Sequence, residues 1–184
     1  MYVEDRKILF IHPQKCAGST IRVLLREQFP TGIEPKPNQH YRAIQWKEEI
    51  GDAFDSCYKI GVIRNPWDRA VSYFYHLKTH QDFKHSFVYF VNRTRLLYNV
   101  NFSAYCKYHI DGEYVMDYMI RQENISEDID MLATKLKFKE YTIGHVDHKT
   151  IRPSKDYRKY YTEKTRSQVE AACQWEINKF GYKF

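Results

Sequence analysis

Patterns that hold metals or disulfides are missing from this sequence. The cysteines form no CxxC pair, and no His/Cys cluster has the spacing of zinc ligands. This excludes a structural zinc site and a disulfide-rich scaffold, so we expect no metal and four reduced thiols, two or three of them in the core. The four cysteines are Cys16, Cys57, Cys106 and Cys173.

Long apolar runs are missing as well. The charged segment 1–7 is followed by only four apolar residues, Ile8 to Ile11. This run is too short for the core of an export signal or for a transmembrane helix. We therefore expect a cytoplasmic protein that has no membrane span.

No run of like charges forms a basic arm or tail, although the formal net charge is +6. A scattered positive charge favours anionic partners, and it does not by itself distinguish nucleotides, acidic glycans, nucleic acids and membrane surfaces. No RNP-like or helix-turn-helix signature is present, so we expect no nucleic acid partner.

The length of 184 residues and the hydrophobic content of 43% predict a single domain over 1–184 with a sizeable core. The apolar run 7–12 predicts a buried parallel strand, and apolar residues at helical spacing predict a helix from Ser19 or Thr20 to Pro30. The alternation of strands and helices predicts an α/β fold, a three-layer sandwich around a mostly parallel sheet. Further strands are expected at 58–63 and 114–120, further helices at 41–50, 67–78, 126–136 and 162–179, a loop at 31–40, and helices and loops over 81–110.

The first strand leads into a loop of sequence HPQKCAGST, residues 12–20. A strand, a short loop and a helix start form a recurrent phosphate site, because backbone N–H groups and the positive end of the helix dipole face the anion. Gly18 permits close backbone approach, Ser19 and Thr20 offer hydroxyl donors, and Lys15 supplies a full positive charge. Taken alone, the loop fits a plain tight turn between strand and helix equally well.

This loop does not match the Walker A pattern GxxxxGK[ST], in which the lysine follows the second glycine. Here the lysine comes first, only one glycine is present, and we find no convincing strand-ending aspartate for magnesium. The pattern therefore disfavours a small P-loop kinase and favours a donor whose transfer needs no metal.

A second strand leads into segment 64–73, of sequence RNPWDRAVSY. Arg64 offers a planar fork suited to bidentate phosphate binding, and Ser72 follows two helical turns later, where its hydroxyl can lie beside the same anion. Asp68 and Arg69 are expected to pair with each other or with the surface. An ordinary helix start is the alternative, and it explains the proline but not the arginine and the serine together.

With both motifs in place, the chain resembles the PAPS-dependent sulfotransferases, especially their carbohydrate-type group. Residues 11–20 resemble the 5′-phosphosulfate loop of that family, which commonly reads like IPKTAGTS, and residues 62–73 resemble its 3′-phosphate motif, which reads like VRNPxxRxxSxY. Thinner likenesses lie at 40–43 (H-x-x-A), at 121–125 (R-x-E-N-L/I) and in the C-terminal helix and tail. The resemblance implies a P-loop-like sulfotransferase fold.

The resemblance also implies a nucleotide donor, 3′-phosphoadenosine 5′-phosphosulfate (PAPS), with the bisphosphate PAP as product and a hydroxyl or amine of a glycan or small molecule as acceptor. Lys15 would bind the 5′-phosphosulfate and stabilise the leaving oxygen, while Arg64 and Ser72 would bind the 3′-phosphate. Arg152 and Ser154 stand where relatives have a late Arg and Ser that help to hold the nucleotide. The loop residues expected on the 5′-phosphate are Cys16, Ala17, Gly18, Ser19 and Thr20.

A hydroxyl acceptor benefits from a general base, and histidine is readily poised near neutral pH. His40 is the first candidate, because it follows the phosphate helix in the loop where relatives place a histidine; a surface histidine in a polar loop is the alternative. Glu123 is the second candidate, although an acid after a strand also serves as a helix cap. His12, His145 and His148 stay open as further candidates, although His12 is expected to pack at the end of the strand.

Two departures from the family pattern bear on the acceptor and on the donor loop. Cys16 stands where relatives usually have threonine or a small residue, and a thiol is a poorer hydrogen-bond donor. The chain is also short for the family, which leaves the acceptor class open. A nucleotide-binding interaction protein that kept the fold and lost the acceptor site is the non-catalytic alternative.

Overall fold

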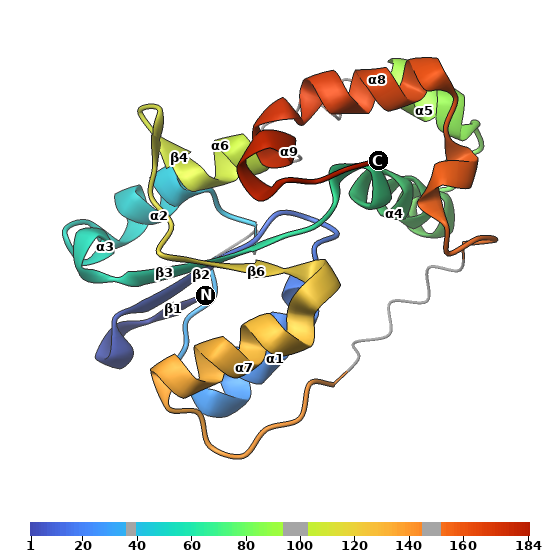
Figure 1. Cartoon of the computed structure of the whole chain (residues 1–184). Coiled ribbons are helices and arrows are strands. Elements are labelled where there is room, and N and C mark those ends of the chain that lie inside the picture. The colour runs from blue at the N-terminus through green and yellow to red at the C-terminus, as the bar shows by residue number, and fades with distance from the viewer. Residues whose placement is uncertain (36–39, 94–102, 145–151) are drawn as a thin grey trace.

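Helices and strands alternate along the chain in a computed structural model, which describes residues 1–35, 40–93, 103–144 and 152–184 (Figure 1). The α-helices are α1 (Gly18–Gln28), α2 (Ala43–Ile50), α3 (Ala53–Ser56), α4 (Pro66–His80), α5 (Phe87–Arg93), α6 (Ala104–Tyr108), α7 (Ile125–Leu136), α8 (Glu163–Ala172) and α9 (Gln174–Phe180). Short 3-10 turns are η1 (Glu4–Arg6), η3 (Gln122–Asn124) and η4 (Tyr157–Tyr160).

The central sheet has the strand order β1-β2-β3-β6 within the described residues. The short β1 (Tyr2–Val3) runs antiparallel to β2 (Ile8–Ile11), whereas β2, β3 (Tyr58–Ile63) and β6 (Tyr118–Arg121) are parallel neighbours. The α/β class predicted from the sequence is confirmed, and the sheet is mixed because β1 turns back on β2. Neither β1 nor α3 was predicted, since elements of two and four residues are too short to show a period.

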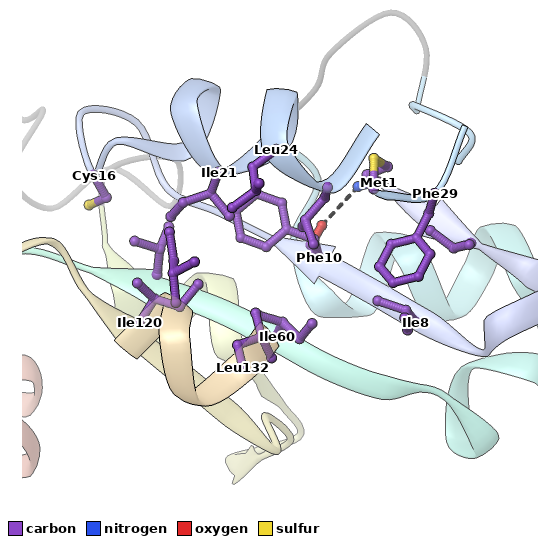
Figure 2. Packing of buried hydrophobic residues seen from close by; sticks show 14 residues of the cluster. Met1, Ile8, Phe10, Cys16, Ile21, Leu24, Phe29, Ile60, Ile120 and Leu132 are labelled. Atoms are coloured by element: carbon purple, nitrogen blue, oxygen red, sulfur yellow. Dashed lines mark hydrogen bonds between the residues drawn. The ribbon is translucent and has the colours of Figure 1, made fainter. Parts of the chain in front are cut away.

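One face of the sheet packs against α1 and α7. Ile8 and Phe10 lie on this face, as the two-residue period of a strand requires. They join Ile21 of α1 and Leu132 of α7 in one buried cluster, and Figure 2 shows these side chains packed between the helices and the strands. The apolar stripe that predicts the first helix is therefore the surface with which α1 covers the sheet.

The opposite face is covered by α2, α3 and α6. The alternate strand residues Leu9 and Ile11 lie here and pack with Trp46 of α2, Phe54 of α3 and Tyr108 of α6. Helices thus cover both faces of the sheet and form three layers (Figure 1).

A second, mainly aromatic cluster holds α4 against α5 and α8. Phe74 of α4 lies 5.4 Å from Phe87 and 5.7 Å from Phe90, measured between ring centroids. The tilted and edge-to-face geometry of these rings is the favourable one for aromatic pairs. This cluster fixes the direction of α4, whose first turn follows directly after β3.

The predicted strand 114–120 is wrong in its first half. Its start belongs to β5 (Glu113–Tyr114), which pairs with β4 (His109–Ile110), while the sheet strand begins at Tyr118. The hairpin turns at Asp111 and Gly112, which both have positive φ, 50° and 84°. Asp-Gly is a favoured pair for such a turn, so this signal is present in the sequence and outweighs the apolar alternation.

The predicted helix 162–179 is two helices, because the chain leaves the helical region at Cys173 with φ −117° and ψ 23°. No glycine or proline marks the break. The change of direction lets α9 bring Glu176 within 3.5 Å of the buried Arg69. The predicted helices 41–50, 67–78 and 126–136 are confirmed as α2, α4 and α7, with ends within two residues.

All four cysteines are free thiols, and three of them are buried, as the sequence predicted. No helix in the four described ranges is long and apolar enough to cross a membrane.

Truncation of Leu132 to alanine tests the packing of α7 on the sheet. Leu132 is 1% exposed in the core cluster, so Leu132→Ala is expected to lower the free energy of unfolding by about 2–5 kcal/mol. Its neighbour Met131 is 55% exposed, and Met131→Ala is the matched control, with a change expected within about 0.5 kcal/mol. Urea unfolding of both variants measures the difference, and equal losses would contradict this packing.

Candidate functional site

Three connecting segments leave the same edge of the sheet. The segment after β2 begins at His12, the one after β3 at Arg64, and the one after β6 at Gln122. Because these strands are parallel neighbours, their carboxyl ends lie side by side (Figure 1). Open α/β sheets usually bind ligands outside this edge.

The loop between β2 and α1 turns sharply enough to present backbone N–H groups. Lys15 and Ala17 have positive φ values of 64° and 60°, and α1 begins directly afterwards at Gly18. The first N–H groups of a helix have no intrahelical partner, and left-handed residues turn neighbouring N–H groups toward one side, which suits an anion. Ser19 and Thr20 lie half-buried on this first turn.

Cys16 was expected among the nucleotide-binding residues, but its thiol lies in the core (Figure 2). Burial raises the pKa of this thiol, so Cys16 packs as a small apolar group. Its Sγ is 3.6 Å from the Gln14 carbonyl oxygen and 4.0 Å from Nη1 of Arg69. A thiol donor facing a ligand is therefore excluded here, and only the backbone N–H of Cys16 is left for that role.

The ring of His12 fills the space beside Gly18. It is buried and stacks on Phe10 with 5.3 Å between ring centroids. An ideal Cβ on Gly18 would lie 2.1 Å from His12 Nδ1. Burial also lowers the pKa of His12 well below its usual value, so the ring is neutral. The glycine that the sequence assigns to ligand approach is thus already required by the packing of this histidine.

Arg64 connects the two predicted motifs. Its Nη1 donates to the backbone oxygen of Lys15 at 3.1 Å. Its Nε and Nη2 donate to Asp68 Oδ2 at 2.9 and 2.6 Å. The guanidinium therefore contacts the loop between β2 and α1 on one side. On the other side it is held by the carboxylate of Asp68, which lies in the first turn of α4.

Asp68 also accepts a hydrogen bond from Arg152 through its other carboxylate oxygen. The structure thus brings together Arg64 and Arg152, which are 88 residues apart (152 minus 64) in the sequence. Ser72 lies one turn beyond Asp68 on the same side of α4. Ser154, unlike Arg152, is not hydrogen-bonded to Asp68 in the structure. Its hydroxyl donates to the Asp156 carbonyl oxygen and accepts from the Asp156 N–H, so it stabilises the local turn at residues 154–156.

Asn65 and Glu123 tie the ends of β3 and β6 together. The Asn65 side chain caps α4 by accepting from the N–H groups of Trp67 and Asp68 at 3.0 and 3.2 Å. Glu123 accepts from the backbone N–H of Asn65 with one carboxylate oxygen and from the Tyr182 hydroxyl with the other, at 3.1 Å. Both oxygens of Glu123 are engaged, which gives this residue a structural role.

Arg69 does not pair with Asp68 or with the surface, and this prediction is wrong. It is fully buried, with Nη2 3.5 Å from Glu176 Oε1 and Nη1 against the thiol of Cys16. Glu176 in turn accepts from the N–H of Ala104, the first residue of α6, at 3.2 Å. This buried ion pair therefore joins α4, α6 and α9 next to Cys16 of the loop between β2 and α1.

His40 lies beside the loop rather than on an open surface. Its ring is in edge contact with His12, with 4.6 Å between centroids, and its Nδ1 is 3.4 Å from the His12 carbonyl oxygen. Burial, assisted by the cations Lys107, Arg22 and Lys15, lowers the pKa of His40 to about 4. The imidazole is therefore neutral at pH 7, in the form that accepts a proton.

Lys15 carries the positive charge of the loop itself. Burial lowers its pKa, and the neighbouring Arg64 lowers it further. Two cations held this close are repelled by each other and attract a doubly charged anion. Among the described residues, no group of three or more His, Cys, Asp or Glu side chains could hold a metal ion. The further base candidates His145 and His148 lie outside the described residues.

Asp68 was predicted to pair with Arg69 or with the surface, and it pairs instead with Arg64 and Arg152. The pair of Arg64 and Asp68 has the i,i+4 spacing of helical ion pairs, so it was visible in the sequence. Two further groups, Tyr182 and Lys107, were not singled out from the sequence. The roles of Tyr182 and Lys107 depend on contacts 59 and 67 residues away along the chain, and no local pattern announces them.

Comparison with known proteins assigns no family to this arrangement. No protein-family model matches the chain, and no curated protein matches it. The resemblance to sulfotransferases remains a prediction that rests on the two motifs.

Substitution of Gly18 tests how tightly the loop packs on His12. Gly18→Ala is expected to lower the free energy of unfolding by about 1–3 kcal/mol, because the added methyl overlaps the ring. The double variant Gly18→Ala/His12→Ala should lose clearly less than the sum of the two single losses, since the ring is then absent. Urea unfolding measures all three variants, and strict additivity would mean that the ring and the glycine are not in contact.

Proposed function

We propose that this protein is a sulfotransferase that uses PAPS as donor and transfers its sulfuryl group to a hydroxyl or amine of a carbohydrate or small-molecule acceptor. The observation that carries the proposal is the hydrogen bond from Arg64 to the backbone of Lys15. It joins, at one edge of the sheet, the two motifs expected to bind the two phosphate groups of one nucleotide. The strand–loop–helix arrangement of β2 and α1 supports a P-loop-like sulfotransferase fold.

The loop fits the 5′-phosphosulfate end of such a donor. Backbone N–H groups at the start of α1, together with the hydroxyls of Ser19 and Thr20, offer neutral donors, and Lys15 offers the charge. Lys15 is the residue that stabilises the negative charge developing on the oxygen between phosphorus and sulfur. Charge stabilisation of this kind usually contributes most to transfer reactions.

The arginine pair around Asp68 fits the 3′-phosphate. Arg64 and Arg152 carry two positive charges against the single charge of Asp68, so the cluster keeps a net charge of +1 (2 − 1). Ser72, one turn along α4, adds a hydroxyl on the same side. A second phosphate distinguishes PAPS and PAP from ordinary adenylates, which makes this cluster the specificity-determining part of the proposed donor site.

His40 is the proposed base. Its neutral imidazole takes the proton of the acceptor hydroxyl as the acceptor oxygen forms its bond to sulfur. The bond between sulfur and the bridging oxygen breaks, and its electron pair stays on the 5′-phosphate oxygen beside Lys15. Each residue is thus given one part of an in-line transfer in which no metal is required.

Nucleotide-dependent thermal stability tests the donor. PAP without magnesium is expected to stabilise the protein by about 2.7 kcal/mol at a hundredfold excess over Kd. ATP with magnesium should stabilise it little, because ATP has no 3′-phosphate.

Arg64→Met is expected to weaken PAP binding about 10- to 100-fold, since one charge-assisted hydrogen bond contributes about 1.5–3 kcal/mol.

The matched control for Arg64→Met is Arg6→Met, which removes an exposed arginine on η1 and should leave the affinity for PAP unchanged. Calorimetric titration of the three proteins gives the affinities. Stronger stabilisation by ATP and magnesium than by PAP would remove the sulfotransferase proposal in favour of a kinase.

Two further variants separate binding from transfer. Lys15→Ala is expected to abolish sulfuryl transfer, because the charge on the leaving oxygen is then uncompensated. His40→Ala is expected to abolish transfer while PAP binding stays within about twofold, because His40 is not among the residues proposed to bind the nucleotide. Radiolabelled sulfate transfer to a panel of glycans and small molecules reads out both variants. Full activity of His40→Ala would exclude this histidine as the base.

A further inference from the structure

Lys107 is buried without a carboxylate partner. It lies near the end of α6 with 0% of its surface exposed, and among the described residues no Asp or Glu lies within ion-pair distance of its Nζ. Its hydrogen-bond acceptor is the backbone oxygen of His40. Burial, assisted by the nearby Arg42, lowers the pKa of Lys107 to about 8.

A buried ammonium of this kind is costly. Removing it from water is unfavourable, and a single carbonyl oxygen compensates only part of the loss. A methionine would fill the same volume without that cost. The ammonium therefore needs a reason beyond packing, and the residue that it contacts is the proposed base.

The position of Lys107 is fixed from the protein core. The hydroxyl of the next residue, Tyr108, accepts from the N–H of Val62 at 3.0 Å and donates to the carbonyl oxygen of the same residue at 2.5 Å, which ties α6 to the central strand β3. At the other end of α6, Glu176 accepts from the N–H of Ala104. Lys107 thus extends from a rigid support toward the loop that carries His40.

The two contacts of His40 act on different parts of the residue. Lys107 holds its backbone oxygen, while His12 holds the ring from the other side through the edge contact and the 3.4 Å approach of Nδ1 to the His12 carbonyl oxygen. Together they limit both the displacement of the loop at residue 40 and the rotation of the imidazole. A base that must meet an acceptor hydroxyl within hydrogen-bond distance needs both limits.

In the part of the chain that the structure describes, the charged and titratable groups that face His40 include His12, Lys107, Arg22 and Lys15. His12 is neutral because burial lowers its pKa well below its usual value. The three cations all disfavour the imidazolium form, and of these Lys107 is the one in contact with the His40 backbone. Removal of the Lys107 charge is therefore expected to raise the pKa of His40.

We propose that Lys107 is a positioning residue for His40: its ammonium holds the His40 carbonyl oxygen and so places the imidazole for proton transfer from the acceptor. This role rests on the proposed function. It assigns to the end of α6, far from both nucleotide motifs in the sequence, a part in the acceptor half of the site.

Lys107→Met tests this role, because it keeps the length of the side chain and removes the donor and the charge. The variant is expected to lower kcat about tenfold or more and to leave the affinity for PAP within twofold. The acid limb of the kcat–pH profile should move to higher pH. The titration of the His40 ring, followed by NMR and assigned with the His40→Ala spectrum, should move in the same direction.

Lys59→Met is the matched control. Lys59 is also buried and also donates to a backbone oxygen, that of Cys57, at 2.9 Å, but it lies at the amino end of β3, away from the carboxyl edge. It should leave kcat and the His40 titration unchanged even if it lowers stability as much as Lys107→Met does. Lys107→Gln, which keeps a neutral donor, should restore part of kcat.

The outcomes distinguish the two proposals. If Lys107→Met leaves both kcat and the His40 titration within error of the wild type, the positioning role is overturned. Equal effects of Lys107→Met and Lys59→Met on kcat overturn it too, because they would indicate general destabilisation. If the proposed function is wrong, the wild-type protein will bind no PAP. In that case the His40 titration still shows whether Lys107 holds the loop that carries His40.

Discussion

The guanidinium of Arg64 is the junction on which the candidate site depends. It lies at the carboxyl end of β3, reaches the backbone of Lys15, and shares the carboxylate of Asp68 with Arg152. Without it, the loop after β2 and the first turn of α4 would be two separate helix starts. With it, the two regions proposed to bind the 5′- and 3′-phosphates form one continuous surface. A nucleotide with phosphates at both ends of its ribose would require such a surface.

Polar contacts hold this junction, and each one joins elements that are distant in the sequence. The buried pair of Arg69 and Glu176 connects α4, α6 and α9 under the loop. Such a pair is costly to bury unless hydrogen bonds compensate for the lost water. Nearer the surface, Glu123 connects the ends of β3 and β6 with Tyr182. These contacts limit the movement of one edge of the sheet, as a site that acts by positioning needs.

The sequence was sufficient for the parts of the site that follow from local pattern and strand order. Two strand–loop–helix motifs on neighbouring parallel strands must meet at one edge, and Pro66 takes the first position of α4, where proline is a known preference. The rest depends on tertiary packing. Nothing local to residue 107 shows that a lysine in the last turn of a short helix reaches His40. Nothing local to Cys173 shows that the last helix breaks there to bury Glu176. The sequence suggested that position 18 needs a glycine so that a ligand can approach the backbone. In the structure, the glycine is needed because the His12 ring occupies the space of a Cβ.

The most direct test of the two-phosphate account is a crystal structure with PAP bound. The account predicts the 5′-phosphate against the backbone N–H groups of residues 16–20 with Lys15 beside it, and the 3′-phosphate between Arg64 and Ser72. A nucleotide bound at another edge of the sheet, or with its 3′-phosphate in solvent and Arg64 still paired only with Asp68, would contradict it.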